Sequence, residues 1–170
     1  MLTVWISHTV ERELTSLTSV QVGLVPSGRG TPDRYVTVSR DGDPFLRVDI
    51  YADSGSSAFE EAIVWRDNVV VGFDYHIHLI ALSDHAHRSI PLEWYFAHLY
   101  PSERTLLVTS AQRVFCIGAD QHLLWRSEVV GSDGVVLDEI DGPIVRGKGE
   151  WDPPGGWRPF ALQASSGERA

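Results

Sequence analysis

Apolar and polar residues alternate with a period of two along most of this chain, and helical periodicity is almost absent. Because successive side chains of a strand point to opposite faces of a sheet, this alternation is typical of half-buried β-strands. The pattern predicts an all-β fold with strands over residues 3–7, 21–25, 35–39, 45–51, 61–66, 69–73, 76–82, 89–93, 105–110, 113–118, 123–127, 135–140, 144–147 and 158–163.

Short polar connections separate these runs, as at Asp41-Gly42-Asp43-Pro44 and Asp141-Gly142-Pro143. Such turn residues join neighbouring antiparallel strands, so we expect a meander. Two segments compete for helix, Val10 to Ser16 and Pro91 to Leu99.

With 170 residues, 43% of them hydrophobic, the chain has the size of a single all-β domain, 1–170. Its apolar runs are too short to cross a membrane, and its first residues lack the basic lead of a secretory signal. The single cysteine, Cys116, sits in a strongly apolar strand and is expected to be a buried thiol. One cysteine cannot form an internal disulfide, so we expect a reducing, cytoplasmic location.

A weak internal repeat with an offset of 37 residues links Val71, Val108 and Val145. Residues His76 and Ile80 match Arg113 and Ile117 at the same offset. All-β units of about 40 residues are typical of propeller blades. The approximate repeats are 33–59, 60–100, 101–132 and 133–167.

Residues 69–83 and 107–125 resemble blades of the pyrroloquinoline-quinone-type β-propeller family, most clearly in the run from Val114 to Trp125. The resemblance covers roughly residues 60–167, and Trp125 alone stands at the tryptophan-docking position. It implies blade-like repeats in a small or partial propeller. No residue here matches a quinone site, so no cofactor is predicted.

Closure of so few blades requires a strand shared between the chain's two ends, and residues 2–6 are the candidate for pairing with the last repeat. If the repeats do not close, the alternative is an open meander folded into a β-sandwich.

The net charge of −9 weighs against nucleic acid, because phosphate binding requires clustered Lys and Arg. Lys148 is the only lysine, and the arginines are dispersed. Acidic residues gather between Asp133 and Asp152, which indicates either a solvated surface or a face for a basic partner.

Four histidines form the main candidate for chemistry. His76 and His78 alternate on one predicted strand, and His85 and His87 follow in a loop, an arrangement that could bind a metal. The alternative places His76 and His78 on a solvated face. No nucleophile motif or phosphate loop accompanies them.

The second candidate is the segment that breaks the repeat, with two tryptophans among prolines and glycines. Rigid aromatic residues on a loop are typical of binding hot spots, whereas the alternative is a lid over the core. The predicted binding residues of this loop and its acidic flank are Glu150, Trp151, Asp152, Trp157, Arg158, Asp138, Glu139 and Asp141.

The leading hypothesis is therefore a non-catalytic binding protein with this loop as its surface, in the manner of a bacterial immunity protein that neutralises a basic partner. One alternative is a metal-dependent enzyme that uses the histidines. Another is a small-ligand binder with a pocket lined by Trp94, Tyr95 and Phe96.

Overall fold

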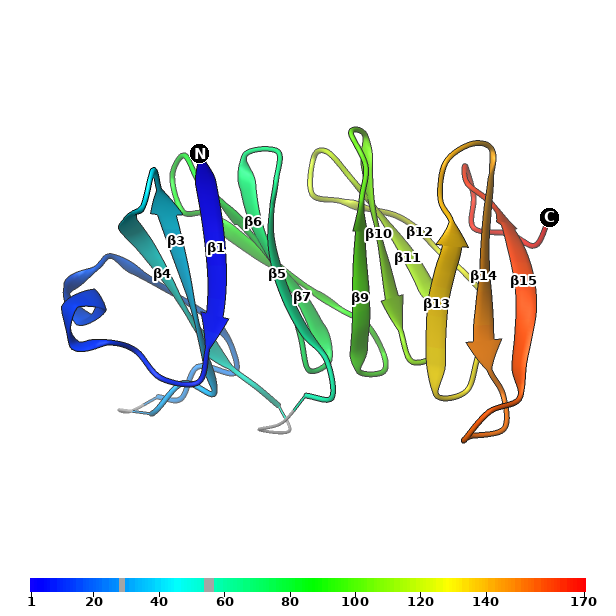
Figure 1. The fold of residues 1–170 in the computed structure, drawn as a ribbon, viewed down its shortest axis with the longest axis horizontal. Helices are drawn as coiled ribbons and strands as arrows, with labels where there is room; N and C mark the ends of the chain where they lie inside the picture. Colours follow the sequence, from blue (N-terminus) through cyan, green and yellow to red (C-terminus); the bar gives the residue numbers. More distant parts are fainter. Residues whose placement is uncertain (28–29, 54–56) are drawn as a thin grey trace. The chain divides into compact units, whose positions relative to one another are not determined.

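The computed structural model describes residues 1–27, 30–53 and 57–170. The prediction of an all-β protein is confirmed: strands hold 56% of its residues and helix 3%. The strands form four mostly antiparallel sheets, and within the described residues none of the sheets closes into a barrel. The chain divides into two compact units, Met1–Pro91 and Leu92–Ala170 (Figure 1).

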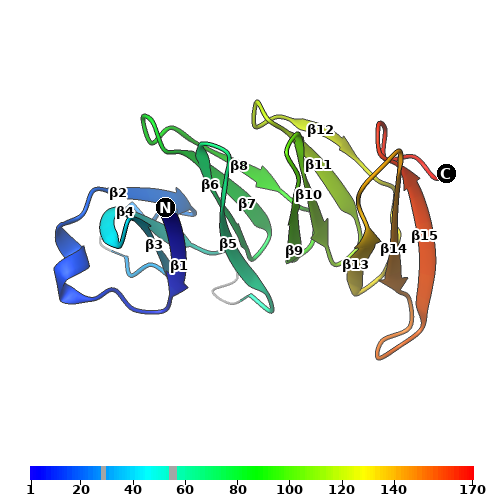
Figure 2. The same cartoon turned by 45° about the horizontal axis from the view of Figure 1, so that its top comes forward.

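The first sheet has the order β1-β3-β4-β2. Its strands are β1 (Leu2–Ser7), β2 (Ser19–Gly23), β3 (Arg34–Arg40) and β4 (Asp43–Tyr51). β2 lies beside β4 and runs parallel to it, so this sheet is not a meander (Figure 2). The short 3-10 helix η1 (Arg12–Ser16) lies within Val10 to Ser16, one of the two segments in which a helix was a possible alternative.

The second sheet is a meander of four consecutive strands. These are β5 (Glu60–Trp65), β6 (Asn68–Phe73), β7 (His76–Ala81) and β8 (His87–Pro91). All six residues of β6 are buried, which explains its continuous apolar run, because a strand covered on both faces has no polar side.

The second unit contains the remaining two sheets, in the orders β12-β11-β10-β9 and β13-β14-β15. The third sheet has β9 (Phe96–Pro101), β10 (Thr105–Ser110), β11 (Val114–Gly118) and β12 (Leu123–Arg126). The fourth has β13 (Gly134–Glu139), β14 (Ile144–Glu150) and β15 (Trp157–Gln163). Val71, Val108 and Val145, related by the 37-residue offset, lie in β6, β10 and β14, each the second strand of its sheet.

Each unit has its own core. In the first unit, valines and isoleucines of β2, β3 and β4 pack with Val69, Val71 and Phe73 of β6. In the second unit, Val114 and Cys116 of the third sheet pack against Val145, Phe160 and Leu162 of the fourth.

Two expectations about strands are wrong. The N-terminal strand does not close the chain onto its last repeat, because β1 pairs with β3 from Leu2↔Arg40 to Ser7↔Tyr35. The segment that could have been helical, Pro91 to Leu99, contains the start of β9, which pairs with β10. Among the strands of the described residues, β9 is also the one that the alternation did not predict.

Candidate functional site

The loop between β14 and β15, residues 151–156, is held by hydrogen bonds at its base. The Trp151 N–H donates to the Gly156 carbonyl at 3.3 Å, and the Gly155 N–H donates to Glu150 Oε1 at 2.5 Å. Gly155 and Gly156 have φ values of 114° and 62°, which side chains rarely adopt. Proline, glycine and Glu150 together give the loop a defined conformation.

The two tryptophans of this region have different surroundings. Trp157 opens β15 opposite Glu150 and is 45% exposed. A Cβ atom at Gly134 would lie 3.1 Å from the Trp157 ring, so the indole reaches across β14 toward β13. Trp151 is half-buried, with the Arg158 guanidinium 6.0 Å from its ring centroid. Trp157 therefore does not cover the core as a lid, because nearly half of its side chain is exposed.

Tyr95, which precedes the third sheet, also contacts this region, although the sequence did not predict it. The Tyr95 hydroxyl donates to the Asp133 carbonyl at 2.5 Å and to Asp133 Oδ1 at 2.9 Å. Burial, followed by this hydrogen bond, raises the pKa of Tyr95 to about 12, so the hydroxyl remains a donor at all physiological pH values. Ser132 and Asp133 in turn donate their backbone N–H groups to the Glu150 carbonyl. We call the group Tyr95, Asp133, Glu150, Asp152 and Trp157 the aromatic–acidic surface.

The predicted acidic flank does not lie entirely at this surface. Asp141 stands in the β13–β14 turn, whereas Asp152 stands in the β14–β15 loop, and the seven residues of β14 separate them. At roughly 3.3 Å per residue, the two turns are about 20 Å apart.

Two further carboxylates of the flank are paired with bases of β14. Asp138 Oδ2 lies 3.4 Å from Lys148 Nζ, and Glu139 Oε2 lies 3.2 Å from Arg146 Nε. All four side chains are at least half exposed, so each pair contributes at most about 1 kcal/mol to stability. Their effect is mainly to offset negative charge on the fourth sheet.

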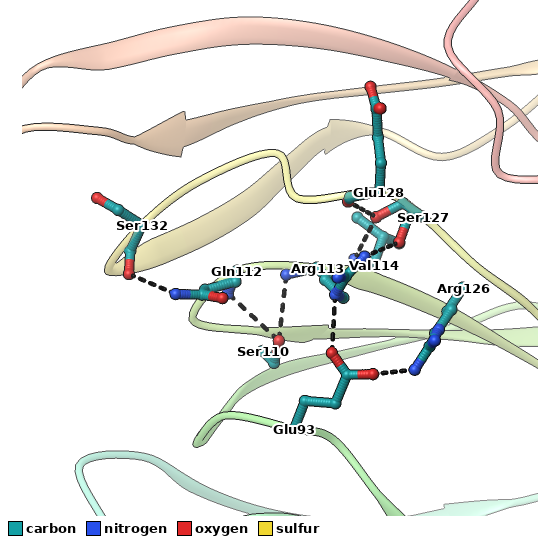
Figure 3. A network of polar contacts seen from close by, with 9 residues as sticks. All are labelled: Glu93, Ser110, Gln112, Arg113, Val114, Arg126, Ser127, Glu128 and Ser132. Carbon is teal, nitrogen blue, oxygen red and sulfur yellow. Dashed lines mark hydrogen bonds and ion pairs between the residues drawn. The ribbon is translucent and has the colours of Figure 1, made fainter.

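A polar network ties the segment that leads into the fourth sheet to the third sheet (Figure 3). The Glu93 carboxylate pairs with both Arg113 and Arg126. Arg113 Nη1 also donates to the Ser127 carbonyl at 2.7 Å. Gln112 donates its side-chain N–H to the Ser132 carbonyl at 3.4 Å. The segment that connects β12 to β13 is thus tied to the β10–β11 turn.

Ser127 is the buried centre of this network. It is 2% exposed, and its hydroxyl accepts the Val114 N–H at 3.0 Å and donates to the Glu128 carbonyl at 2.7 Å. We expect Ser127→Ala to lower the free energy of unfolding by about 1–3 kcal/mol, because the buried Val114 N–H loses its acceptor. Urea denaturation measures this, with Ser83→Ala on an exposed turn as the control. A loss no larger than that of the control would contradict the role of Ser127.

The four histidines have dissimilar environments. His78 is 2% exposed, with Nδ1 2.7 Å from Ser89 Oγ, so the expectation of a solvated face is wrong for this residue. The His76 ring stacks on it with centroids 5.7 Å apart. His85 lies in the following turn with φ 62°, and His87 is exposed on β8. In the described residues no group of three or more His, Cys, Asp or Glu side chains is arranged to hold a metal ion.

Burial, together with the neighbouring His76 and His87, lowers the pKa of His78 to about 3. The unfolded chain, with a histidine pKa near 6.5, then binds a proton that the folded protein excludes, so stability falls as the pH drops below about 6.5. We expect the free energy of unfolding to fall by about 2 kcal/mol between pH 6.5 and pH 5 because of His78.

Urea denaturation at pH 7 and pH 5 tests this. In His78→Gln that part of the pH dependence should be absent, whereas exposed His8→Gln should retain it. An unchanged pH dependence in His78→Gln would show that His78 is not the titrating group.

The three aromatic residues that were expected to line a ligand pocket differ in their surroundings. Phe96 is fully buried, Trp94 is 48% exposed, and Tyr95 is hydrogen-bonded to Asp133.

Cys116 is buried as expected, and burial raises the pKa of its thiol to about 11. No helix in the described residues has the length and apolarity required to cross a membrane.

No protein-family model matches this chain, and no curated protein matches it.

Proposed function

We propose that this chain is a non-catalytic, cytoplasmic binding protein that docks a basic protein partner on its aromatic–acidic surface, as an immunity protein neutralises its target. The observation that carries the proposal is Trp157, an exposed indole at the start of β15, directly after a loop of defined conformation. Its neighbours Glu150 and Asp133 are acidic. A rigid aromatic anchor within a polar rim is the usual composition of a binding hot spot.

The charge of the molecule supports a basic partner. A net charge of −9 attracts positively charged surfaces over distances of several ångströms and accelerates their association. Because Asp138 and Glu139 already pair with Lys148 and Arg146, the carboxylates proposed to meet the partner are those of the loop end, Glu150 and Asp152.

The four sheets are proposed to be blade-like repeats related to the pyrroloquinoline-quinone-type propellers. Trp125 supports this relation. Its indole N–H donates to the Ala164 carbonyl at 3.0 Å, and its ring lies against Gly167 at the end of the next sheet. Docking of one repeat's tryptophan on the following repeat is what the resemblance implies. The proposal includes no quinone or other cofactor.

Affinity purification from cells that express the gene tests the proposed function, with wild type and three variants as bait. We expect wild type and Trp94→Ser to retain the same basic protein, and Trp157→Ser to lose it, since Trp94 is exposed to a similar extent but lies outside the surface. Asp152→Lys should weaken retention, most strongly at low salt, because it reverses a charge at the contact.

Thermal denaturation of the same variants is the control for folding. Asp152→Lys replaces an exposed side chain and should change stability by less than about 0.5 kcal/mol. The two tryptophans are exposed to a similar extent, so Trp157→Ser and Trp94→Ser should lose similar amounts of stability. Equal recovery of the partner by Trp157→Ser and wild type would refute the proposal, as would a loss of stability in Trp157→Ser much larger than in Trp94→Ser.

A further inference from the structure

A pocket of about 710 Å³ opens in the second unit, at the end of β14 away from the aromatic–acidic surface. Three segments line its mouth: Ser102 to Thr105 at the β9–β10 turn, Ile140 to Pro143 at the β13–β14 turn, and Gln163 to Ser165 at the end of β15. Its volume lies within the range of small-molecule sites, about 300–1,000 Å³. Nothing in the proposed partner contact uses this end of the unit.

The floor of the pocket is apolar. Leu107, Cys116 and Val145 line it and are 6%, 2% and 1% exposed. The Cys116 thiol remains protonated at neutral pH because burial raises its pKa to about 11, so it adds a soft, uncharged surface. Such a floor suits the apolar body of a ligand.

The mouth carries two charges of opposite sign on turns from different sheets. Arg104 belongs to the turn of the third sheet and Asp141 to the turn of the fourth, and both are exposed. Among the described residues, neither side chain is engaged in an ion pair. Glu103 accompanies Arg104 on its turn. An exposed charge without a fixed partner is available to a ligand at little desolvation cost.

From the apolar floor and the two opposed charges, we infer that this pocket binds a small zwitterion with an apolar side chain, of the class of the apolar α-amino acids. The ligand carboxylate faces Arg104, the ammonium faces Asp141, and the side chain lies on Leu107, Cys116 and Val145. A ligand with only one of the two charges leaves one rim residue without its counterion.

Three probes of equal apolar body separate the charge requirements: L-phenylalanine, 3-phenylpropionate with the carboxylate alone, and 2-phenylethylamine with the ammonium alone. Isothermal titration calorimetry measures the affinity of each probe. The indole N–H cross-peak of Trp125, which donates to the pocket-lining Ala164 carbonyl, provides a second readout.

We expect L-phenylalanine to bind and to shift the Trp125 cross-peak, with the single-charge probes binding about fivefold or more weakly. Arg104→Gln should remove the advantage over phenylethylamine, and Asp141→Asn the advantage over phenylpropionate. Asp152→Asn, an exposed carboxylate on the opposite turn, is the matched control and should bind like wild type.

Absence of binding by L-phenylalanine, or equal binding of all three probes, would overturn the inference. Binding that persists unchanged in Val145→Trp, which fills the floor, would place the ligand elsewhere and also overturn it. Val145→Trp is compared only if its circular dichroism spectrum matches that of wild type. The second variant, Leu107→Met/Cys116→Val, reshapes the floor at similar volume and should bind L-phenylalanine more weakly than wild type. Unchanged affinity in this folded variant would also overturn the inference. Trp157→Ser should leave the pocket unaffected, so failure here is distinct from failure of the partner contact.

Discussion

Replacing Asp49 with alanine is expected to lower the free energy of unfolding by about 3–5 kcal/mol, because it leaves a buried guanidinium without its counterion. Arg47 Nε and Nη2 donate to the two oxygens of Asp49 at 2.7 and 3.0 Å. The side chains are only 13% and 6% exposed. This hydrogen bond raises the pKa of Arg47. The guanidinium keeps its charge even without the carboxylate, because an arginine side chain is not deprotonated in proteins.

Arg47 also connects this ion pair to the N-terminal segment, because its Nη1 donates to the Leu14 carbonyl at 2.9 Å. Loss of Asp49 should therefore loosen η1 as well as β4. Urea denaturation measures the global change, and hydrogen exchange of amides in residues 12–23 measures the local one.

Asp43→Ala, at an exposed position of the same strand, is the matched control and should cost less than about 0.5 kcal/mol. The double variant Arg47→Met/Asp49→Leu should recover much of the loss, because apolar residues of similar volume can replace a buried ion pair. A cost below 1 kcal/mol for Asp49→Ala would mean that the guanidinium finds water or another acceptor.

Trp125→Ala is expected to destabilise the second unit by about 3–5 kcal/mol, the usual cost of deleting a large buried aromatic side chain. Trp125 is 9% exposed and belongs to the core cluster that joins the third and fourth sheets. Its removal deprives the Ala164 carbonyl of the indole donor and opens a cavity over Gly167.

Trp94→Ala is the control, since Trp94 is 48% exposed and has little apolar surface to lose from a core. Trp125→Phe should fall between the two, as it keeps most of the packing and loses the hydrogen bond. Gly167→Ala should reproduce part of the loss, because its Cβ would lie 2.3 Å from the Trp125 ring at a residue with φ 73°. Calorimetry and hydrogen exchange of residues 92–170 measure these changes, and a Trp125→Ala variant as stable as Trp94→Ala would contradict them.

The local pattern of the chain was sufficient for most strands and for the fold class. Alternation works where one face is buried, as in β14, where Val145, Gly147 and Gly149 are buried and Arg146 and Lys148 are exposed. β9 was not predicted, because Pro91, Glu93 and a cluster of aromatic residues obscure the alternation before Phe96. The partner of a strand is not encoded in its own pattern, which is why the pairing of β1 with β3 and the parallel placement of β2 were not predicted.

The candidate site was predictable only at its centre. Two tryptophans in a loop of prolines and glycines indicated an ordered hairpin, but which indole is exposed depends on the neighbouring strands, above all on Gly134. Tyr95 joins the surface through a contact with Asp133, 38 residues away in sequence, and no spacing rule connects the two. His78 shows the same limit, because its burial depends on what covers both faces of β7.

The parallel pairing of β2 with β4 has a consequence for the order in which the protein folds on the ribosome. β1 and β2 leave the ribosome before β3 and β4, the strands with which they pair, so the apolar Val20 and Val22 stay exposed until residue 51 has emerged. From β5 to β8, by contrast, each strand pairs with the next one synthesised, and closing such short loops is fast. While the first sheet is incomplete, the nascent chain therefore exposes apolar strand residues for a longer stretch of synthesis, whereas the later meanders can form as they are made.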